Sequence, residues 1–286
     1  MATNRDPRAG DVPLDGQVAL VTGAGRGFGR FFAEGLAKAG AAVAVVARSN
    51  GEIAETVRQI ERAGGRALAV AADVTDRRAI EKLAADVERQ LGPLDLLVNN
   101  AGVDDAVGPL WAVDPDQWWR EMDINLRGPF LCAHAVLPGM LERGRGRIIN
   151  VASLGGTVAR AHRSAYACSK AALIRLTECL TLETRQHAPG ICAFAIHPGI
   201  VMTSMNEGHL RNPDVARWLP RMRGLVETMG DGSPEPAIRL ILFLASGQAD
   251  ALSGRFIDAE ADDVEALVRD ADAIAQDERR VLRLRP

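Results

Sequence analysis

The chain is poor in aromatic and sulfur-containing side chains. It has 286 residues, of which 4% are aromatic, and it contains a single tyrosine, Tyr166. Its four cysteines form no C-x-x-C pair, and no cluster of cysteine and histidine has the spacing of a zinc site. We therefore expect neither a disulfide framework nor a bound metal. We interpret the cysteines as buried free thiols of a protein in a reducing compartment.

The chain also lacks a strong excess of one charge and any long apolar run. Its formal net charge is −3, so no basic field attracts nucleic acid or an anionic membrane. No run reaches the ~18 apolar residues that span a bilayer, and the N-terminal residues 1–15 contain no apolar stretch typical of a signal peptide. We expect a cytoplasmic protein without nucleic-acid or membrane partners, whose residues 1–15 form a loose arm.

Short apolar runs alternate with longer helical patterns along the chain. Runs that are apolar throughout are typical of parallel strands buried on both faces, and seven such runs cover residues 17–22, 41–47, 67–72, 94–100, 147–153, 191–199 and 254–259. The amphipathic patterns between them include residues 30–40, 51–65 and 76–92. The alternation predicts an α/β fold, with a single Rossmann-type doubly wound domain and a seven-stranded parallel sheet flanked by helices.

No linker-like stretch divides the chain, so we predict one catalytic domain over residues 16–260. Residues 203–236 break the strand–helix rhythm directly after the sixth strand, where doubly wound sheets bind ligands. We interpret this irregular segment as a mobile lid, with an ordinary surface excursion as the alternative. Its apolar side chains suggest a partly apolar substrate; they are Met202, Met205, Trp218 and Met222. Residues 261–286 predict a short helix and a charged tail that either packs on a neighbouring subunit or frays.

A glycine-rich loop, "VTGAGRGFGR", stands between the first predicted strand and the first helix. Gly23, Gly27 and Gly29 have the spacing G-x-x-x-G-x-G. Glycines let the backbone turn tightly and approach a pyrophosphate at a helix N-terminus. In this position the loop predicts a dinucleotide site that includes Arg26 and Phe28. A merely tight turn is the alternative.

The second predicted strand ends in Ala47-Arg48-Ser49 and has no carboxylate there. A carboxylate at this point would bond the adenosine ribose and repel a 2′-phosphate, whereas Arg48 can pair with a phosphate. The sequence therefore favours NADP over NAD, with Arg48 and Ser49 at the ribose. Stacking of Arg48 on adenine is the alternative.

Several further motifs occur in a fixed order. They are "TGAGRGFG" at 22–29, "DV" at 73–74, "NNAG" at 99–102, "INLRG" at 124–128, Ser153, "YACSK" at 166–170 and "PGIVMT" at 198–203. Together they resemble the classical group of the short-chain dehydrogenase/reductase family. The resemblance extends from about Gly16 to Asp258.

The resemblance implies an oxidoreductase that transfers a hydride between a nicotinamide cofactor and a secondary alcohol or ketone. Tyr166 would be the general acid/base, Lys170 would hold the nicotinamide ribose and tune Tyr166, and Ser153 would bind the substrate oxygen. Asn125 would link Lys170 to a water-mediated proton path. The cofactor would also contact Asp73, Val74, Asn99, Asn100, Ala101, Gly102, Tyr166, Lys170, Pro198, Gly199, Val201 and Thr203. The family's usual assembly implies a homodimer or homotetramer.

The chemistry also follows from the residues themselves. Tyr166 and Lys170 stand at i and i+4, so on a helix they share one face. A nearby cation lowers a tyrosine pKa from its usual value of about 10, which would make Tyr166 a better base at neutral pH. Ser153 follows the fifth strand, where its hydroxyl can stabilise charge on a reacting oxygen.

Other interpretations stay open. One is an NAD-dependent alcohol dehydrogenase, and another is an epimerase or dehydratase, although those typically space their glycines G-x-x-G-x-x-G. A non-catalytic dinucleotide-binding regulator would be expected to have lost part of the Ser–Tyr–Lys set, which is complete here. The substrate is left open among polyols and sugars, hydroxysteroids, 3-oxoacyl thioesters and cyclic terpenoid alcohols.

The remaining polar and aromatic residues near the motifs receive structural interpretations. We interpret His162 and His197 as structural or pocket-wall residues. Asp104 and Asp105 follow "NNAG"; we interpret them as parts of a solvated loop, with a place at the mouth of the pocket as the alternative. Three tryptophans near a helix start would pack or meet a partner; they are Trp111, Trp118 and Trp119.

Overall fold

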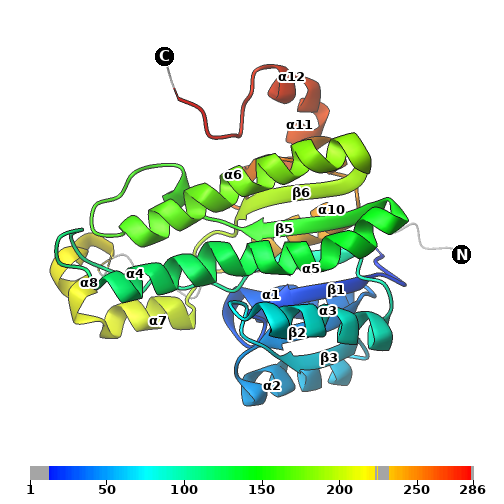
Figure 1. The fold of residues 1–286 in the computed structure, drawn as a ribbon, viewed down its shortest axis with the longest axis horizontal. Helices are drawn as coiled ribbons and strands as arrows, with labels where there is room; N and C mark the ends of the chain where they lie inside the picture. Colours follow the sequence, from blue (N-terminus) through cyan, green and yellow to red (C-terminus); the bar gives the residue numbers. More distant parts are fainter. Residues whose placement is uncertain (1–12, 223, 225–231, 285–286) are drawn as a thin grey trace, which may run out of the picture.

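A parallel sheet forms the centre of the molecule. The computed structural model describes residues 13–222, 224 and 232–284. Its seven strands pair in the order β3-β2-β1-β4-β5-β6-β7, and every pair is parallel (Figure 1). Their bounds are β1 Val18–Thr22, β2 Ala42–Ala47, β3 Arg66–Ala71, β4 Leu96–Asn99, β5 Arg145–Val151, β6 Gly190–His197 and β7 Phe256–Asp258. The predicted seven-stranded Rossmann-type sheet is confirmed.

Helices cover both faces of the sheet, because side chains of a buried strand alternate between the faces. In β6, for example, Phe194 and Ile196 pack in the core cluster beneath α1 and α10, whereas Ala193 packs in the cluster on the opposite face. The first layer contains α1 (Gly27–Lys38), α2 (Asn50–Arg62) and α10 (Glu235–Ala245). The second layer contains α3 (Arg77–Leu91), α5 (Gly128–Arg143) and α6 (Ser164–His187).

The order of strands reverses beside β1, which pairs with β2 on one side and with β4 on the other. At such a switch point the connections leave in opposite directions, and a crevice opens at the carboxyl ends of the strands. The glycine loop follows β1 there, and the "NNAG" segment begins at the end of β4. Parallel pairing thus brings two motifs about 75 residues apart to one edge of the sheet.

The described part of the predicted lid includes the regular helices α7 (Ser204–Arg211) and α8 (Pro213–Trp218), and in this it differs from the irregular segment expected from the sequence. Asn212 separates them, and its side-chain oxygen accepts a hydrogen bond from the Asp214 amide while Pro213 begins α8. Asn212 and Pro213 thus form a local N-terminal cap for α8. Both helices are too short to show a hydrophobic period in the sequence, and for this reason the sequence did not predict them. Residues 223 and 225–231 of the predicted lid and residues 1–12 of the predicted arm lie outside the described residues. Leu14, in the rest of the arm, is not loose: its side chain is buried in the core and its amide donates to the Ala39 carbonyl at 2.7 Å.

The C-terminal segment packs on its own chain, which neither sequence interpretation anticipated. After α11 (Val264–Arg269) and α12 (Ala271–Gln276) the chain returns to the edge of β7, where the Phe256 amide donates to the Arg280 carbonyl at 2.9 Å (Figure 1). Arg280 pairs with Asp262, and Arg283 pairs with Glu178 on α6. Ion pairs to buried carboxylates thus fix the charged tail as far as Arg283.

Among the described residues, no helix is both long enough and apolar enough to span a membrane.

A chain of buried amide and hydroxyl groups joins the centre of the sheet to α6. Asn99 Nδ2 on β4 donates to Asn150 Oδ1 on β5 at 2.9 Å, and Asn150 Nδ2 donates to Thr177 Oγ1 on α6 at 2.9 Å. All three side chains are buried. Since a buried polar group without a partner is costly, this chain fixes how α6 lies on the sheet.

We expect Asn150→Leu to destabilise the fold by about 1–3 kcal/mol, because it leaves the Asn99 amide without its main partner. The double variant Asn99→Leu/Asn150→Leu should cost less than the sum of the two single variants, because it removes both members of the pair. Urea unfolding of the three variants measures both effects. Strictly additive losses would show that the two amides do not depend on each other.

Candidate active site

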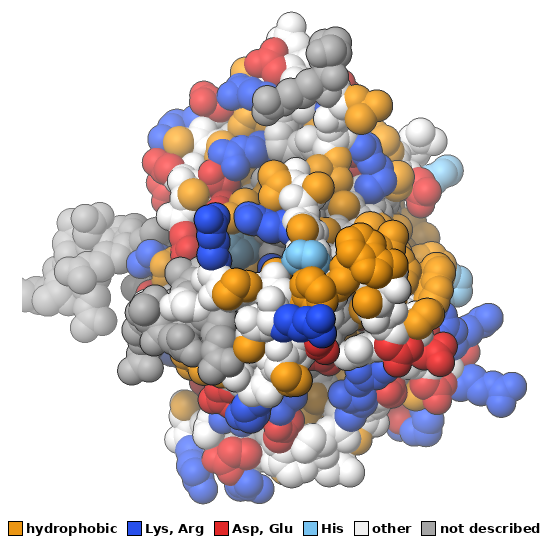
Figure 2. All heavy atoms as spheres, turned by 90° about the vertical axis from the view of Figure 1, so that its left-hand side faces the viewer, with side chains coloured by type: hydrophobic (Ala, Val, Ile, Leu, Met, Phe, Trp, Pro, Cys, Tyr) orange, Lys and Arg blue, Asp and Glu red, His pale blue; other side chains and the backbone are white. Residues whose placement is uncertain are grey.

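A cavity of about 1110 Å³ opens at the carboxyl ends of the strands, between the glycine loop and the lid helices α7 and α8. Figure 2 shows the molecule from this side, where the surface is hollowed and basic side chains lie beside the opening. All the residues predicted for catalysis and cofactor binding line the cavity, apart from Gly29, Asn99 and Asn125. The tertiary structure therefore brings segments from Gly23 to Thr203 around one space.

The glycine loop is packed against the end of β4. Gly23 and Gly27 have φ angles of +64° and +54°, a region that favours glycine. Asn100 Nδ2 donates to the Thr22 carbonyl at 2.9 Å and to the Gly23 carbonyl at 3.3 Å. A Cβ on Gly29 would overlap the Gly23 carbonyl and the Asn100 amide, so Gly29 serves the close packing beneath the loop.

The loop leaves the N-terminus of α1 directed at the cavity. Arg26 occupies the N-cap position without a side-chain hydrogen bond to the first turn, whereas Ser49 caps α2 by accepting from the Glu52 amide. The first backbone N–H groups of a helix have no partner within the helix and carry positive partial charge. This donor set, with the missing Cβ atoms of the loop, fits the pyrophosphate of a dinucleotide.

The residues expected at the adenosine ribose lie on the surface beside this loop. The Arg48 side chain is 60% exposed, and its Nη1 lies 4.0 Å from Asp73 Oδ2. Burial would raise the pKa of Asp73, but hydrogen bonds from Thr75 and the charge of Arg48 hold that pKa below its usual value. Arg26 forms a second exposed ion pair, with Glu52 at 3.3 Å. Two accessible guanidinium groups therefore stand at this end of the cavity.

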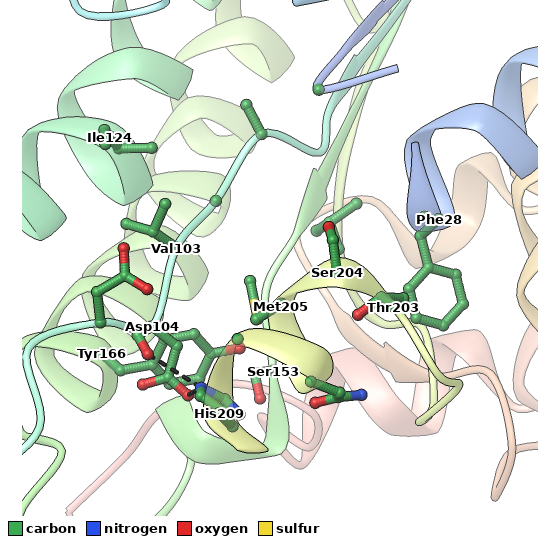
Figure 3. A pocket seen from close by; sticks show the side chains of 18 of the residues that line it. Phe28, Val103, Asp104, Ile124, Ser153, Tyr166, Thr203, Ser204, Met205 and His209 are labelled. Carbon is green, nitrogen blue, oxygen red and sulfur yellow. Dashed lines mark hydrogen bonds and ion pairs between the residues drawn. The ribbon is translucent and has the colours of Figure 1, made fainter. Parts of the chain in front are cut away.

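Ser153 and Tyr166 meet at the other end of the cavity, near the lid helix α7 (Figure 3). Ser153 precedes a short 3-10 turn, η2 (Leu154–Gly156); its hydroxyl accepts a hydrogen bond from the Gly155 amide at 3.0 Å and lowers the pKa of the Tyr166 side chain. A Cβ on Gly155 would lie 3.2 Å from the Tyr166 ring, and one on Gly156 would lie 2.6 Å from the backbone of Lys170. The "GG" pair thus lets the turn approach α6, and it is a signal that the sequence analysis did not use.

Lys170 lies one helical turn beyond Tyr166 and is only 4% exposed. Its Nζ donates to the Val151 carbonyl at the end of β5 at 2.7 Å and lies 5.6 Å from the centre of the Tyr166 ring. Burial lowers the pKa of Lys170 to about 8, although the charges of Glu121 and Asp104 act in the opposite direction.

Asn125 lies behind the cavity wall on a π-helical turn, η1 (Asp123–Arg127). Its Nδ2 donates to the Val103 carbonyl at 2.8 Å and to Ser169 Oγ at 3.2 Å, and its Oδ1 accepts from the Val103 amide at 2.9 Å. A Cβ on Gly102 would contact both Asn125 Oδ1 and Lys170 Nζ, at 3.2 and 3.5 Å. In the described residues no direct hydrogen bond joins Asn125 to Lys170, so Asn125 acts on the loop between them.

The ionisation of Tyr166 differs from the sequence expectation. Burial raises the pKa of Tyr166 to about 12, and the negative charge of Asp104 adds to this, whereas the Ser153 hydrogen bond and the Arg163 charge lower it. The sequence predicted a lowering by Lys170. In the protein's own surroundings desolvation outweighs the positive charges, and Arg163, 4.5 Å from the ring centre, is the nearer of the two cations that face the ring.

A buried cluster around Asp104 was not anticipated. Asp104 is 1% exposed, so the interpretation of it as part of a solvated loop is wrong, whereas the side chain of Asp105 is 51% exposed. Asp104 pairs with Arg163 at the start of α6, and His209 Nε2 on α7 lies 3.1 Å from its Oδ2 (Figure 3). The partners come from three separate segments, and no spacing in the sequence links them.

Glu121, at the end of α4 (Pro115–Met122), is a second buried carboxyl group behind this cluster. It accepts hydrogen bonds from the amides of Asp105 and Ala106 at 2.8 and 2.9 Å. Burial raises the pKa of Glu121 to about 7, and the nearby charge of Asp104 adds to the rise.

The other residues singled out in the sequence are divided between the cavity and the surface. His162 and His197 line the cavity, and the His162 ring lies 5.2 Å from that of Trp218 on α8. Met205, Trp218 and Met222 also line it, but Met202 does not. Outside the cavity, Trp111 and Trp119 are exposed, and Trp118 Nε1 donates to Ser164 Oγ at 3.0 Å.

Comparison with known proteins decides the family. A family model for short chain dehydrogenases matches residues 17–214, which include the glycine loop, Ser153, Tyr166 and Lys170. The chain belongs to the short-chain dehydrogenase family. The family resemblance inferred from the motifs is thereby confirmed.

The relatives of this short-chain dehydrogenase cover most of its length. It is 36% identical to the short chain dehydrogenase citE of Monascus ruber, over 93% of this chain and 88% of the relative. It is 35% identical to galactitol 2-dehydrogenase of Rhizobium johnstonii, over 87% and 95%. A solved gluconate 5-dehydrogenase of Burkholderia cenocepacia, in complex with NADP and tartrate, matches with a TM-score of 0.76 and 32% identity, over 87% and 96%. The chain is an oxidoreductase acting on CH–OH groups.

His209 gives this short-chain dehydrogenase a pH-dependent contact between lid helix and core. Burial would lower the pKa of His209, but the hydrogen bond and charge of Asp104 outweigh burial and raise it above its usual value of 6.5. The stabilisation of docked α7 by protonated His209 is therefore complete below about pH 6.5 and is lost as the pH rises through the raised pKa.

We accordingly expect the backbone amides of residues 204–211 to lose protection from hydrogen exchange as the pH rises above neutrality. Exchange rates corrected for their intrinsic pH dependence measure this. His209→Gln keeps a donor for Asp104 but cannot titrate, so in this variant protection should not depend on pH over the same range. The same pH dependence in wild type and variant would rule out His209 as the titrating group.

Proposed function

We propose that the enzyme transfers a hydride between NADP and a secondary alcohol or ketone, with Tyr166 as general acid/base. The observation that carries the proposal is the meeting of Ser153, Tyr166 and Lys170 at one end of the cavity whose other end is formed by the glycine loop. When bound, the dinucleotide donates or accepts the hydride. Gly23, Gly27 and the first turn of α1 would hold its pyrophosphate.

The remaining cofactor contacts are proposed from the same cavity. Arg48 and Ser49 would lie at the adenosine ribose and Asp73 and Val74 beside the adenine. The nicotinamide half would be bordered by two groups of lining residues: Asn100, Ala101 and Gly102 after β4, and Pro198, Gly199, Val201 and Thr203 after β6. Thr203 also contacts the glycine loop, because a Cβ on Gly27 would lie 3.4 Å from its methyl group.

The chain's own residues account for the proton step. A carbonyl oxygen that gains negative charge needs a proton donor and a hydrogen-bond donor within reach. The pKa of about 12 keeps the Tyr166 phenol protonated at neutral pH, which suits the donor in ketone reduction. The Ser153 hydroxyl lines the same end of the cavity and would hold the same oxygen. In the oxidation direction Tyr166 would accept the proton, and nearby positive charge would assist it.

We expect Tyr166→Phe to lower kcat by about 10²–10⁴-fold, since it removes the proton donor but keeps the ring. The dissociation constant of the cofactor should change little, because the phenol oxygen lies at the substrate end of the cavity. Steady-state kinetics with a panel of ketones, and fluorescence titration with NADPH, measure the two quantities. Turnover close to that of the wild type would overturn the assignment of Tyr166.

The preference for NADP rests on Arg48. This arginine is 60% exposed and is held only by a 4.0 Å ion pair to Asp73, so it is accessible to a 2′-phosphate. An NAD-dependent alcohol dehydrogenase is the alternative, in which Arg48 would stack on the adenine and make no phosphate contact.

We expect Arg48→Gln to lower kcat/KM with NADP by about ten- to a hundredfold, the value of a charged hydrogen bond, with a much smaller change for NAD. Arg58→Gln is a matched control, because Arg58 is an exposed arginine of α2 that pairs with Glu55 and does not line the cavity. Equal losses with both cofactors in Arg48→Gln would contradict the proposed phosphate contact.

For the substrate we propose a polyhydroxy alcohol or its ketone, because named relatives act on galactitol and gluconate. Met205, Trp218 and Met222 add an apolar wall to the cavity and favour a substrate that also has a carbon face. A non-catalytic regulator is disfavoured by the convergence of Ser153, Tyr166 and Lys170.

We further propose a homodimer or homotetramer, a cytoplasmic location, one catalytic domain over residues 16–260 and a lid around residues 203–236. Membership of the family supports the homo-oligomer. The four cysteines are free thiols, which supports a reducing compartment, but only Cys132 and Cys192 are buried as expected, whereas Cys168 and Cys179 are exposed. Size-exclusion chromatography with light scattering tests the assembly.

A further inference from the structure

We propose that Arg163 is a positioning residue that sets the ionisation of Tyr166, and that the lid helix α7 holds it in place through His209 and Asp104. The inference deepens the proposed function, since it concerns the residue assigned there as acid/base. It names three residues, in separate segments of the chain, that no motif of the family match had singled out.

Arg163 lies directly on the aromatic ring of Tyr166. The carbon of its guanidinium group is 4.5 Å from the centre of the ring, within the range of a cation–π contact. Its side chain is only 17% exposed, so solvent screens its charge weakly. Arg163 is also the residue before α6, and the helix therefore fixes its backbone three residues ahead of Tyr166.

Asp104 determines where the guanidinium lies. Arg163 Nε donates to Asp104 Oδ1 at 3.2 Å, and Arg163 Nη2 donates to Asp104 Oδ2. The guanidinium group therefore binds the carboxylate in a bidentate manner. This two-pronged geometry fixes direction as well as distance. Because Asp104 is almost fully buried, breaking this pair would leave an uncompensated charge, which is strongly unfavourable.

His209, on α7, is the second partner of the Asp104 carboxylate. Its Nε2 lies 3.1 Å from Asp104 Oδ2 and 3.0 Å from the Asp104 carbonyl oxygen. His209 is the buried residue of α7, and Figure 3 shows its ring beside Asp104 and Tyr166. Docking of α7 therefore places the imidazole on Asp104, and the same carboxylate orients Arg163. The position of the lid helix and the charge around Tyr166 are coupled through one carboxylate.

The negative charges near Tyr166 explain why a cation is needed beside its ring. Asp104, from the loop after β4, and Glu121, from α4, both present negative charge to the phenol. Ser153, from the turn η2, supplies a neutral hydrogen bond. Lys170, from α6, is farther from the ring, and its Nζ donates to the Val151 carbonyl. Arg163 is thus the nearer of two cations at the ring of Tyr166, where it offsets part of the negative charge of these carboxylates.

The single tyrosine of the chain makes the test direct, because every tyrosinate signal comes from Tyr166. The ultraviolet absorbance of tyrosinate is titrated in the enzyme saturated with oxidised cofactor, and kcat/KM for alcohol oxidation is measured over the same pH range. Arg163→Met removes the charge and keeps an unbranched side chain. We expect both midpoints to rise by about one pH unit or more. Arg163→Lys keeps the charge and should restore a large part of the shift.

A matched control and a catalytic control separate the outcomes. Arg185→Met removes a charge from the exposed far end of α6 and should leave the titration unchanged. Tyr166→Phe should abolish the signal. If Tyr166→Phe keeps its turnover while Arg163→Met still shifts the titration, the proposed function fails and the present inference stands. An unchanged titration midpoint in Arg163→Met, whatever its activity, overturns the inference.

The link to the lid is tested by combining variants. His209→Gln should also change the midpoint, since it replaces the imidazole that α7 places against Asp104, the carboxylate that orients Arg163. The shift of Arg163→Lys/His209→Gln should differ from the sum of the single shifts, because both residues act through Asp104. Additive shifts would overturn the coupling between lid and tyrosine. Arg163→Lys and His209→Gln both preserve a donor to Asp104, so the test does not depend on whether Arg163→Met folds.

Discussion

The site depends on the parallel pairing of the sheet. All strands end at the same edge, and the reversal of strand order between β2 and β4 opens a crevice there. The glycine loop after β1, the "NNAG" segment after β4, Ser153 after β5 and Thr203 after β6 all stand at that edge. No other arrangement of these strands would collect them, since an antiparallel neighbour would carry its carboxyl end to the opposite side.

Close backbone contacts then bring the collected segments to reacting distance. Three glycines mark the places where a side chain would prevent this: Gly29 beneath the loop, Gly102 between Asn125 and Lys170, and Gly155 against Tyr166. The buried chain of Asn99, Asn150 and Thr177 keeps α6 fixed on the sheet below them. The precision of the site thus comes from packing beneath it as much as from the residues that line it.

Burial decides the protonation of the site. Tyr166, Lys170 and Glu121 all shift towards their neutral forms, because the interior stabilises charge poorly. Asp104 remains charged because two cationic partners hold it. The Asp104 cluster is therefore the fixed charge near the tyrosine, and the contact of Asp104 with His209 connects this charge to helix α7. A dehydrogenase that must exclude water while it moves a proton has reason to join these two events.

The sequence by itself determined the features that arise from local pattern. The apolar runs predicted the seven strands, the glycine spacing predicted the turn into α1, and the four-residue interval placed Tyr166 and Lys170 on one face of a helix. The sequence did not predict the short helices α7 and α8, because six to eight residues show too little hydrophobic periodicity. Only the tertiary structure decided that Asp104 is buried, that Arg163 lies on the tyrosine ring and that His209 reaches Asp104. These contacts join residues up to 105 positions apart, and the pKa values depend on water excluded by the whole fold.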